Sequence, residues 1–199
     1  MKKNIFIFCG ECATGKSSVE IALQKKFNRV ISYTTREKRS NEEEGKDYFF
    51  VTDEEFEKMS QEGKFLEQTS YTVSGKILKY GLPKIGFLND VPNIIVLNPH
   101  GVAQIFENDS ELLKKGIVFL FKSKLSTRID RYLNRESSSK KFENLAQRLK
   151  QDSIDFENFE DFLKSKAIDY LPIFNEGVTL PIFIKHIEEL INCFNKEGN

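Results

Sequence analysis

The sequence contains few residues that bind metals or form disulfides. Its 199 residues include three cysteines and two histidines. Cys9 and Cys12 have the spacing of a redox motif or of half a zinc site, but no second pair of ligands accompanies them. Three cysteines in a chain of this length also do not predict a disulfide scaffold. We therefore interpret these cysteines as ordinary residues of a globular domain.

The sequence also lacks net charge and long apolar runs. Lys plus Arg number 30 and Asp plus Glu number 30, which excludes the global basic field of a nucleic-acid or membrane binder. No apolar stretch approaches the ~20 residues that span a bilayer. The apolar run after Lys3 stops at Gly10 without a cleavage site, unlike a signal peptide. We expect a cytoplasmic protein with no nucleic-acid and no membrane partner.

Short apolar runs alternate along the chain with segments of helical periodicity. Strands are predicted near residues 4–9, 29–33, 94–97, 117–121 and 168–174, and helices near 16–26, 53–63, 126–162 and 180–194. Thr52 to Glu55 forms a capping box, which predicts the start of the second helix. The alternation predicts an α/β fold, with helices on both faces of a parallel sheet. A cluster of short strands between residues 32 and 82 predicts a small mixed lobe inserted into that core.

A glycine-rich segment follows the first predicted strand. Residues 10–17 read GECATGKS and match the pattern G-x-x-x-x-G-K-[ST] between a strand and a helix. Glycines allow the backbone to curl closely around phosphate, and the helix N-terminus points N–H groups at it. The pattern therefore predicts a nucleoside triphosphate site, with Mg²⁺ held by Ser17. The predicted ATP-binding residues are Gly10, Thr14, Gly15, Lys16, Ser17 and Ser18.

A second cluster of phosphate-binding side chains follows the predicted strand at residues 29–33. Ser32, Arg36, Arg39 and Tyr48 lie close together in sequence, around a loop. Guanidinium groups and hydroxyls are the expected donors to a phosphate monoester. Beside a triphosphate site, this cluster predicts a second, acceptor phosphate.

The same stretch resembles the guanylate kinase family. Residues 32–42 match S-x-T-T-R-x-x-R-x-x-E, residues 45–50 match G-x-D-Y-x-F, and residues 65–67 match F-[LI]-E. Tyr80-Gly81 matches the family's Y-G pair, and Asp169, Tyr170 and Asn175 resemble its late D-Y…N segment. The resemblance covers roughly residues 4–195. It implies an enzyme that transfers a phosphoryl group from ATP to GMP or dGMP, in line and with Mg²⁺.

The resemblance also implies roles for individual residues. Ser32, Arg36, Arg39, Tyr48 and Tyr80 would hold the GMP phosphate, Glu42 would order the acceptor site, and Asn175 would touch the adenine of ATP. Glu67 would accept hydrogen bonds from N1–H and N2–H₂ of guanine. Adenine has no N1–H and would leave this carboxylate unpaired.

Four arginines fall where the family carries a mobile lid with an L-x-x-R-L-x-x-R pattern and a later R-L. Arg131 and Arg135 fit the paired spacing, and Arg148 fits the later R-L, whereas Arg128 lies beside them. Together with Lys16, the arginines that fit the pattern (Arg131, Arg135 and Arg148) would neutralise charge on the transferring phosphoryl group. The chain is thus expected to be one kinase domain, as a monomer or homodimer. Its core would comprise 1–31, 90–125 and 151–199, its acceptor lobe 32–89 and its lid 126–150.

Departures from the family pattern concern recognition of the base and the acidic positions near it. Leu82 stands where a Ser or Thr hydroxyl usually donates to guanine O6. Val96 and Asn98 stand at positions usually occupied by Asp, and Asn98 is expected to accept from a base amino group. His100 replaces a usual Gln. These changes leave open a different nucleoside monophosphate, or another phosphorylated small molecule, as acceptor. A non-catalytic binding domain is the third possibility, which the intact phosphate loop disfavours.

Overall fold

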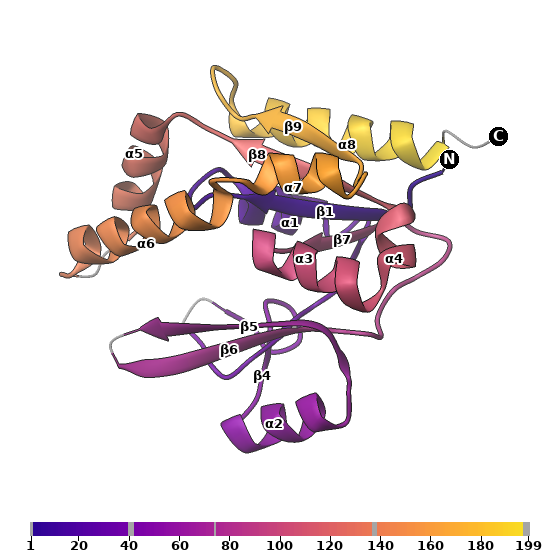
Figure 1. The fold of residues 1–199 in the computed structure, drawn as a ribbon. Coiled ribbons are helices and arrows are strands. Elements are labelled where there is room, and N and C mark those ends of the chain that lie inside the picture. The colour runs from indigo at the N-terminus through magenta and orange to yellow at the C-terminus, as the bar shows by residue number, and fades with distance from the viewer. Residues whose placement is uncertain (1, 40–41, 74, 137–138, 197–199) are drawn as a thin grey trace.

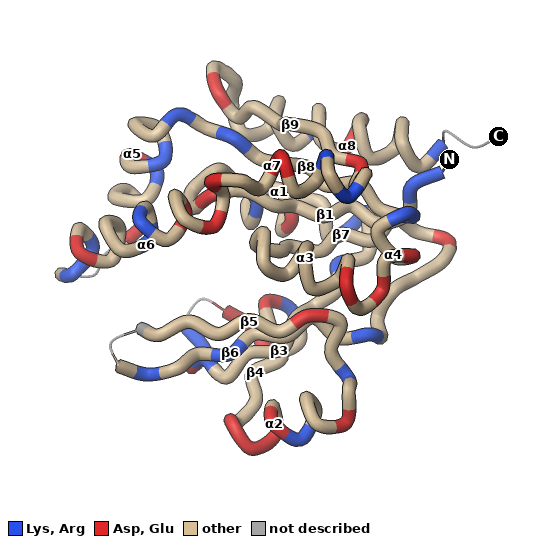
Figure 2. The backbone as a smooth tube through the Cα atoms, viewed as in Figure 1, with Lys and Arg blue, Asp and Glu red and all other residues tan. Residues whose placement is uncertain are grey.

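The structure, a computed structural model, describes residues 2–39, 42–73, 75–136 and 139–196. A parallel sheet covered by helices forms the larger part, and a smaller mixed sheet lies beneath it in the view of Figure 1. No helix among these residues is long and apolar enough to cross a membrane. Figure 2 shows Lys and Arg interspersed with Asp and Glu along the described residues.

The parallel sheet has five strands in the order β2-β7-β1-β8-β9. Its strands are β1 (Ile5–Gly10), β2 (Asn28–Arg29), β7 (Asn93–Val96), β8 (Gly116–Lys122) and β9 (Tyr170–Phe174). Every neighbouring pair runs parallel. All six residues of β1 are buried, since helices cover both faces of the sheet. The predicted α/β fold class is confirmed.

Alternate residues of β1 enter two separate cores. Phe6 and Phe8 pack on the face covered by α1 (Lys16–Leu23) and α8 (Leu180–Lys196). Ile5 and Ile7 pack on the face covered by α3 (Pro99–Asn108), α4 (Ser110–Lys114) and α7 (Phe159–Ser165). This division follows from the two-residue period of a strand. Because helices cover both faces of the sheet, loops gather at the carboxyl ends of the strands.

The second sheet is mixed and has the strand order β4-β3-β6-β5. Its strands are β3 (Tyr33–Thr34), β4 (Phe49–Phe50), β5 (Phe65–Val73) and β6 (Lys76–Pro83), and α2 (Asp53–Gln61) connects β4 to β5. The predicted capping box is confirmed, because the Thr52 side chain accepts from the N–H of Glu55 and the Glu55 side chain accepts from that of Thr52. Ser74, between β5 and β6 in the sequence, lies outside the described residues.

The prediction of one strand over residues 29–33 is wrong. The N–H of Val30 still bonds to Ile94 of the parallel sheet, whereas the carbonyl of Ser32 already accepts from Phe49 of the mixed sheet. The segment therefore divides into β2 and β3, one in each sheet. The predicted helical region 126–162 likewise divides into α5 (Leu125–Arg135), α6 (Lys141–Phe156) and α7. Helices α5 and α6 extend beyond one end of the parallel sheet (Figure 1).

Candidate active site

The phosphate loop joins β1 to α1 and requires glycine at two positions. Gly10 has φ +155°, and a Cβ there would lie 2.4 Å from the carbonyl oxygen of Phe121. Gly15 has φ +101°, and a Cβ there would lie 2.5 Å from Nδ2 of Asn175. A side chain at either position would collide with fixed neighbours in a conformation that L-residues rarely adopt. The backbone of the loop is thus held close to β8 and to the segment after β9.

The first turn of α1 offers N–H groups to an anion. Its N-cap is Gly15, and no side chain caps the helix. Ser17 and Ser18 lie exposed in this turn. Thr14 is fully buried, and its hydroxyl donates to the carbonyl of Glu11 at 2.8 Å, so this side chain braces the loop. The N–H groups and the Ser17 hydroxyl are the kinds of donor and ligand that a Mg²⁺–triphosphate requires.

The Lys16 side chain folds back over the same loop. Its Nζ donates to the carbonyl of Glu11 at 2.9 Å and also to that of Gly10. Burial lowers the pKa of Lys16, because the protein excludes the water that would solvate the ammonium charge. The lysine is therefore held as a donor within the loop where phosphate oxygens would lie.

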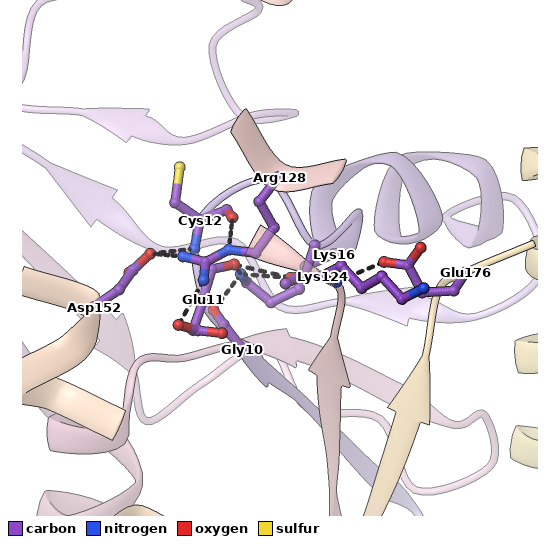
Figure 3. A network of polar contacts seen from close by, with 9 residues as sticks. Gly10, Glu11, Cys12, Lys16, Lys124, Arg128, Asp152 and Glu176 are labelled. Atoms are coloured by element: carbon purple, nitrogen blue, oxygen red, sulfur yellow. Dashed lines mark hydrogen bonds and ion pairs between the residues drawn. The ribbon is translucent and has the colours of Figure 1, made fainter. Parts of the chain in front are cut away.

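A buried arginine of α5 ties the loop to the two projecting helices (Figure 3). The Arg128 guanidinium donates to the Cys12 carbonyl at 2.9 Å and to Oε1 of Glu11 at 2.6 Å. It also pairs with Asp152 of α6, whose Oδ2 accepts from the Cys12 N–H at 2.8 Å. Sequence reasoning assigned no role to Arg128. Its spacing from Leu125 fits the start of the L-x-x-R pattern and could have indicated it.

The three arginines predicted to be catalytic occupy different surroundings. Arg131 donates to Ser123 Oγ and to the Asn175 carbonyl, both at 3.1 Å. Arg135 ends α5, and its guanidinium lies 5.7 Å from the centroid of the Tyr132 ring. Arg148 of α6 is within electrostatic range of Cys12 in the phosphate loop and of Tyr80 in the mixed sheet.

Asn175, predicted to touch adenine, lies against the phosphate loop. It is buried, and its Nδ2 donates to the Thr14 carbonyl at 3.0 Å. Its own carbonyl accepts from Arg131. The next residue, Glu176, accepts from the N–H of Lys124 at 2.6 Å and so holds the start of α5 (Figure 3). The segment after β9 thus connects the loop with α5.

The acceptor cluster is built around Arg36. Its two terminal nitrogens donate to the two carboxylate oxygens of Glu42, at 3.0 and 2.8 Å. Its guanidinium also lies 5.5 Å from the Tyr48 ring centroid. The Arg39 N–H donates to Glu42 at 2.9 Å, while the Arg39 side chain remains 60% exposed. Glu42 therefore bonds to the side chain of one arginine and to the backbone of the other.

Two tyrosines extend this cluster along the mixed sheet. The rings of Tyr48 and Tyr80 contact edge to face, with centroids 5.8 Å apart. Burial raises the pKa of Tyr48 to about 12, so its hydroxyl stays protonated at neutral pH and can donate. Ser32 lies where the chain enters this sheet, and its carbonyl accepts from Phe49. The structure thus places Tyr48 and Arg36 beside Tyr80.

The carboxylate of Glu67 lies buried in β5. Burial raises its pKa to about 7, and a hydrogen bond from the backbone of Leu82 opposes that shift. A Cβ added at Gly101 of α3 would lie 3.0 Å from Glu67 Oε2. Leu82, opposite Glu67 in the β5–β6 ladder, is fully buried in the apolar core. The side chain in place of the usual hydroxyl is therefore a core residue.

Asn98 caps α3 and bridges the two sheets. Its amide oxygen accepts from the Gly101 N–H at 2.7 Å, and its amide nitrogen donates to the Tyr71 hydroxyl at 2.6 Å. The oxygen expected to face a base thus already has a donor. Sequence reasoning did not single out Tyr71 of β5. Because β7 and β1 are parallel neighbours, Asn98 and the phosphate loop lie at the same sheet edge, and Tyr71 brings the mixed sheet there.

Comparison with known proteins gives this arrangement its context. The sequence model of the guanylate kinase family matches residues 2–169. Guanylate kinase of Thermotoga maritima is 47% identical over 70 residues, which is 34% of each chain. That of Streptococcus thermophilus (strain CNRZ 1066) is 26% identical over 96% of this chain and 91% of its own length. The matched segment thus spans about a third of the first relative and nearly all of the second.

A solved structure shows the same fold. The crystal structure of guanylate kinase from Anaplasma phagocytophilum superposes with a TM-score of 0.69 at 22% sequence identity. The match covers 99% of this chain and 88% of the other. Likeness at this identity concerns the fold, and the family assignment comes from the sequence match over residues 2–169. The chain belongs to the guanylate kinase family.

Proposed function

We propose that the protein transfers a phosphoryl group from ATP to the phosphate of GMP or dGMP, giving ADP and GDP or dGDP. Family membership supports this reaction, and the relatives compared are named guanylate kinase. The observation that carries the proposal is the pairing of a phosphate loop with a buried carboxylate. Glu67 lies buried beside Gly101 of α3, the helix that follows the strand next to β1, and its carboxylate can accept two donors from one guanine.

ATP would bind along the phosphate loop. Gly10, Gly15 and the first turn of α1 would surround its phosphates, with Lys16 near the outer ones, and Asn175 would lie toward the adenine. Ser17 would hold Mg²⁺, which supplies charge neutralisation on the phosphates when bound. The fit of Mg²⁺–ATP to the phosphate loop is supported by the start of α1, which has no side-chain cap, and by the exposed Ser17. Mg²⁺ commonly keeps several of its waters and takes oxygens of the substrate phosphates as ligands, so it needs few ligands from the protein.

GMP would bind on the mixed sheet. Arg36, Arg39, Tyr48 and Tyr80 would hold its phosphate, with Ser32 at the edge of this group. Glu67 would read the N1–H and N2–H₂ edge of guanine. Guanine binding favours the ionised form of Glu67, because both base groups are donors.

Catalysis would depend on alignment and charge. The second pKa of the acceptor phosphate is about 6, so it is largely dianionic at neutral pH and needs no strong general base. Lys16, Arg131, Arg135 and Arg148 would stabilise the charge on the transferring group. We propose residues 32–89 as the acceptor lobe and 126–150 as the lid. Their closure over the core would exclude water from the reaction.

A different nucleoside monophosphate is the second candidate acceptor. The buried Leu82 cannot donate to guanine O6, and the Asn98 oxygen already accepts from Gly101. Losing one hydrogen bond costs about 1 kcal/mol, which weakens GMP binding without abolishing it. Glu67, Tyr48 and Tyr80 favour a nucleotide over a sugar phosphate. The glycine geometry of the phosphate loop disfavours a non-catalytic role.

The test is a coupled ADP-release assay with Mg²⁺–ATP. The acceptors are GMP, dGMP, IMP, AMP, CMP, UMP and dTMP. Turnover of GMP and dGMP far above the others would support the proposal. Highest turnover with another acceptor would support a kinase with a different acceptor specificity. Absence of turnover with all seven, with ATP binding intact, would contradict the proposed reaction. The mass of the purified protein in solution would establish whether it is a monomer or a homodimer. We also propose a cytoplasmic location.

A further inference from the structure

The outer edge of β5 is hydrogen-bonded by side chains of a helix. β5 is the last strand of the mixed sheet, so one of its edges has no neighbouring strand among the described residues. Gln104 of α3 accepts from the Gln68 N–H at 2.9 Å and donates to the Gln68 carbonyl at 2.7 Å. Asn108 donates to the Leu66 carbonyl at 3.0 Å. These two amides thus supply bonds that another strand would otherwise make.

The two elements have matching repeats at this contact. Residues 104 and 108 are one helical turn apart, about 6 Å along the axis of α3. Residues 66 and 68 lie on the same edge of β5, about 6.6 Å apart. Helix and strand can therefore bond at two successive positions without distortion. The contact joins the mixed sheet to the helix that follows β7 of the parallel sheet.

Glu67 lies between the two bonded residues. The β5–β6 ladder shifts register between Phe65 and Glu67, and such an irregularity redirects a strand's side chains. The Glu67 carboxylate then reaches Gly101, which belongs to the same helix as Gln104 and lies three residues before it. One helix thus holds the backbone beside Glu67 and also borders its carboxylate.

We propose that Gln104, supported by Asn108, is a positioning residue that fixes the Glu67 carboxylate for recognition of the acceptor base. The inference rests on the proposed reaction with GMP. Gln104 is half-buried and makes two bonds to one residue, whereas Asn108 is exposed beside a cavity of about 500 Å³ where water can replace its bond. Gln104 is therefore the residue to test. A displacement near 1 Å at a recognition group is enough to weaken a reaction strongly.

The first experiment compares the unaltered chain with Gln104→Met. Methionine has nearly the volume of glutamine but lacks both polar groups, so packing is kept and the bonds are removed. We expect the KM for GMP to rise about tenfold, the change that the loss of about 1.4 kcal/mol produces. The KM for ATP is expected to stay within about twofold, because the phosphate loop is untouched. Asn195→Ala is the control, since the Asn195 amide on α8 donates to the carbonyl of Lys3, before β1 and away from the site.

A double-mutant cycle with Glu67→Gln separates positioning from general support of the fold. If Gln104 acts through Glu67, the Gln104→Met change has little further effect on the KM for GMP once Glu67 is altered. An equal effect in both backgrounds would overturn the inference. Should Gln104→Met fail to fold, Gln104→Glu replaces it: the carboxylate can accept from the Gln68 N–H but cannot donate to its carbonyl.

The outcomes distinguish this inference from the proposed function. Turnover of GMP by the unaltered chain, with an unchanged KM in Gln104→Met, would overturn the positioning role alone. No turnover of GMP by the unaltered chain would overturn the proposed function and the inference with it. A parallel rise in the KM values of GMP and ATP in Gln104→Met would indicate general loosening of the fold. It would also overturn the positioning role of Gln104.

Discussion

The carboxylate of Asp152 accepts a hydrogen bond from the backbone N–H of Cys12 at 2.8 Å, across 140 residues of chain. The same carboxylate pairs with Arg128, which in turn donates to the Cys12 carbonyl. Both peptide groups of Cys12 are thus held by helices α5 and α6. The shape of the phosphate loop therefore depends on the segment proposed as the lid.

The first prediction concerns the stability of this network. Asp152→Ala leaves the buried Arg128 with Glu11 as its remaining carboxylate and removes the acceptor for the Cys12 N–H. Removing one partner of a buried pair is costly, and with Glu11 still present we expect a loss of about 1–3 kcal/mol. Urea unfolding measures the change. Asp161→Ala is the control, because the Asp161 side chain is 83% exposed and its pair with Lys164, at 3.5 Å, is also exposed. Its expected effect stays within about 0.5 kcal/mol, and equal losses in both variants would contradict the prediction.

The second prediction concerns pH and Glu67. Burial raises the pKa of this carboxyl to about 7 from an ordinary value of 4.5, so the folded state holds the proton more tightly than the unfolded chain. The resulting stability is fully present below the unfolded pKa and is lost as pH rises through about 7. We expect Glu67→Gln to be more stable than the unaltered chain by about 1–3 kcal/mol at pH 8, while GMP turnover falls.

That difference should shrink to near zero at pH 4.5, where both side chains are uncharged in the folded state. Urea unfolding at pH 4.5, 6 and 8 tests this dependence. A stability difference that does not change with pH would show that the buried carboxylate is not the cause. A carboxylate that is buried for recognition of a ligand is expected to lower the stability of the folded protein at neutral pH.

Local pattern determined which parts of the fold were predictable from sequence. The phosphate loop and the capping box at Thr52 were predictable, because each is defined by residues within one turn or loop. The boundary between β2 and β3 was not, since it depends on bonds to Ile94 in one sheet and Phe49 in the other. Partners that lie far away along the chain leave no signature in a short segment.

The candidate site shows the same division. Arg128 and Arg131 look alike in the sequence, yet Arg128 is buried on the phosphate loop and Arg131 bonds to the Asn175 carbonyl. The cap formed by Asn98 uses the oxygen that was expected to face a base. Gln104 carried no signal, because its partner is the backbone of a strand 36 residues earlier. The chemistry that each side chain can supply was predictable from sequence, whereas the contacts that it makes required the structure.

The third prediction separates two arginines of the acceptor cluster. Arg36 and Glu42 are both largely buried, at 12% and 11% side-chain exposure, whereas Arg39 is 60% exposed. Arg39→Ala is expected to raise the KM for GMP about tenfold or more, through loss of charge-assisted hydrogen bonds, with stability unchanged within about 0.5 kcal/mol. Arg36→Ala should raise the KM and also reduce stability by about 1–3 kcal/mol, because Glu42 loses both bonds from the Arg36 guanidinium and keeps the one from the Arg39 N–H.

Steady-state kinetics and urea unfolding of both variants test this separation. The KM for ATP serves as the internal control, since neither arginine lies on the phosphate loop. Loss of stability in Arg39→Ala comparable to that in Arg36→Ala would show that both arginines are structural. An unchanged KM for GMP in Arg39→Ala would remove it from the acceptor site.

The fourth prediction concerns Ala167, which follows the C-cap of α7 with φ +52°. Its N–H donates to the Lys164 carbonyl at 3.1 Å, and the Ile168 N–H donates to that of Leu163 at 2.9 Å. This pair of bonds ends a helix with one left-handed residue, for which glycine is favoured. An L-residue there costs about 1–2 kcal/mol, and part of that is offset by the greater freedom of glycine in the unfolded chain.

Ala167→Gly is therefore expected to stabilise the protein by about 0.5–1 kcal/mol, measured as a higher urea midpoint with an unchanged slope. Ala146→Gly provides the opposite sign, because Ala146 is exposed inside α6, where glycine costs about 1 kcal/mol. The two variants make the same chemical change, so composition alone cannot produce opposite shifts. If both destabilise the chain equally, the left-handed conformation of Ala167 carries no strain that glycine can relieve.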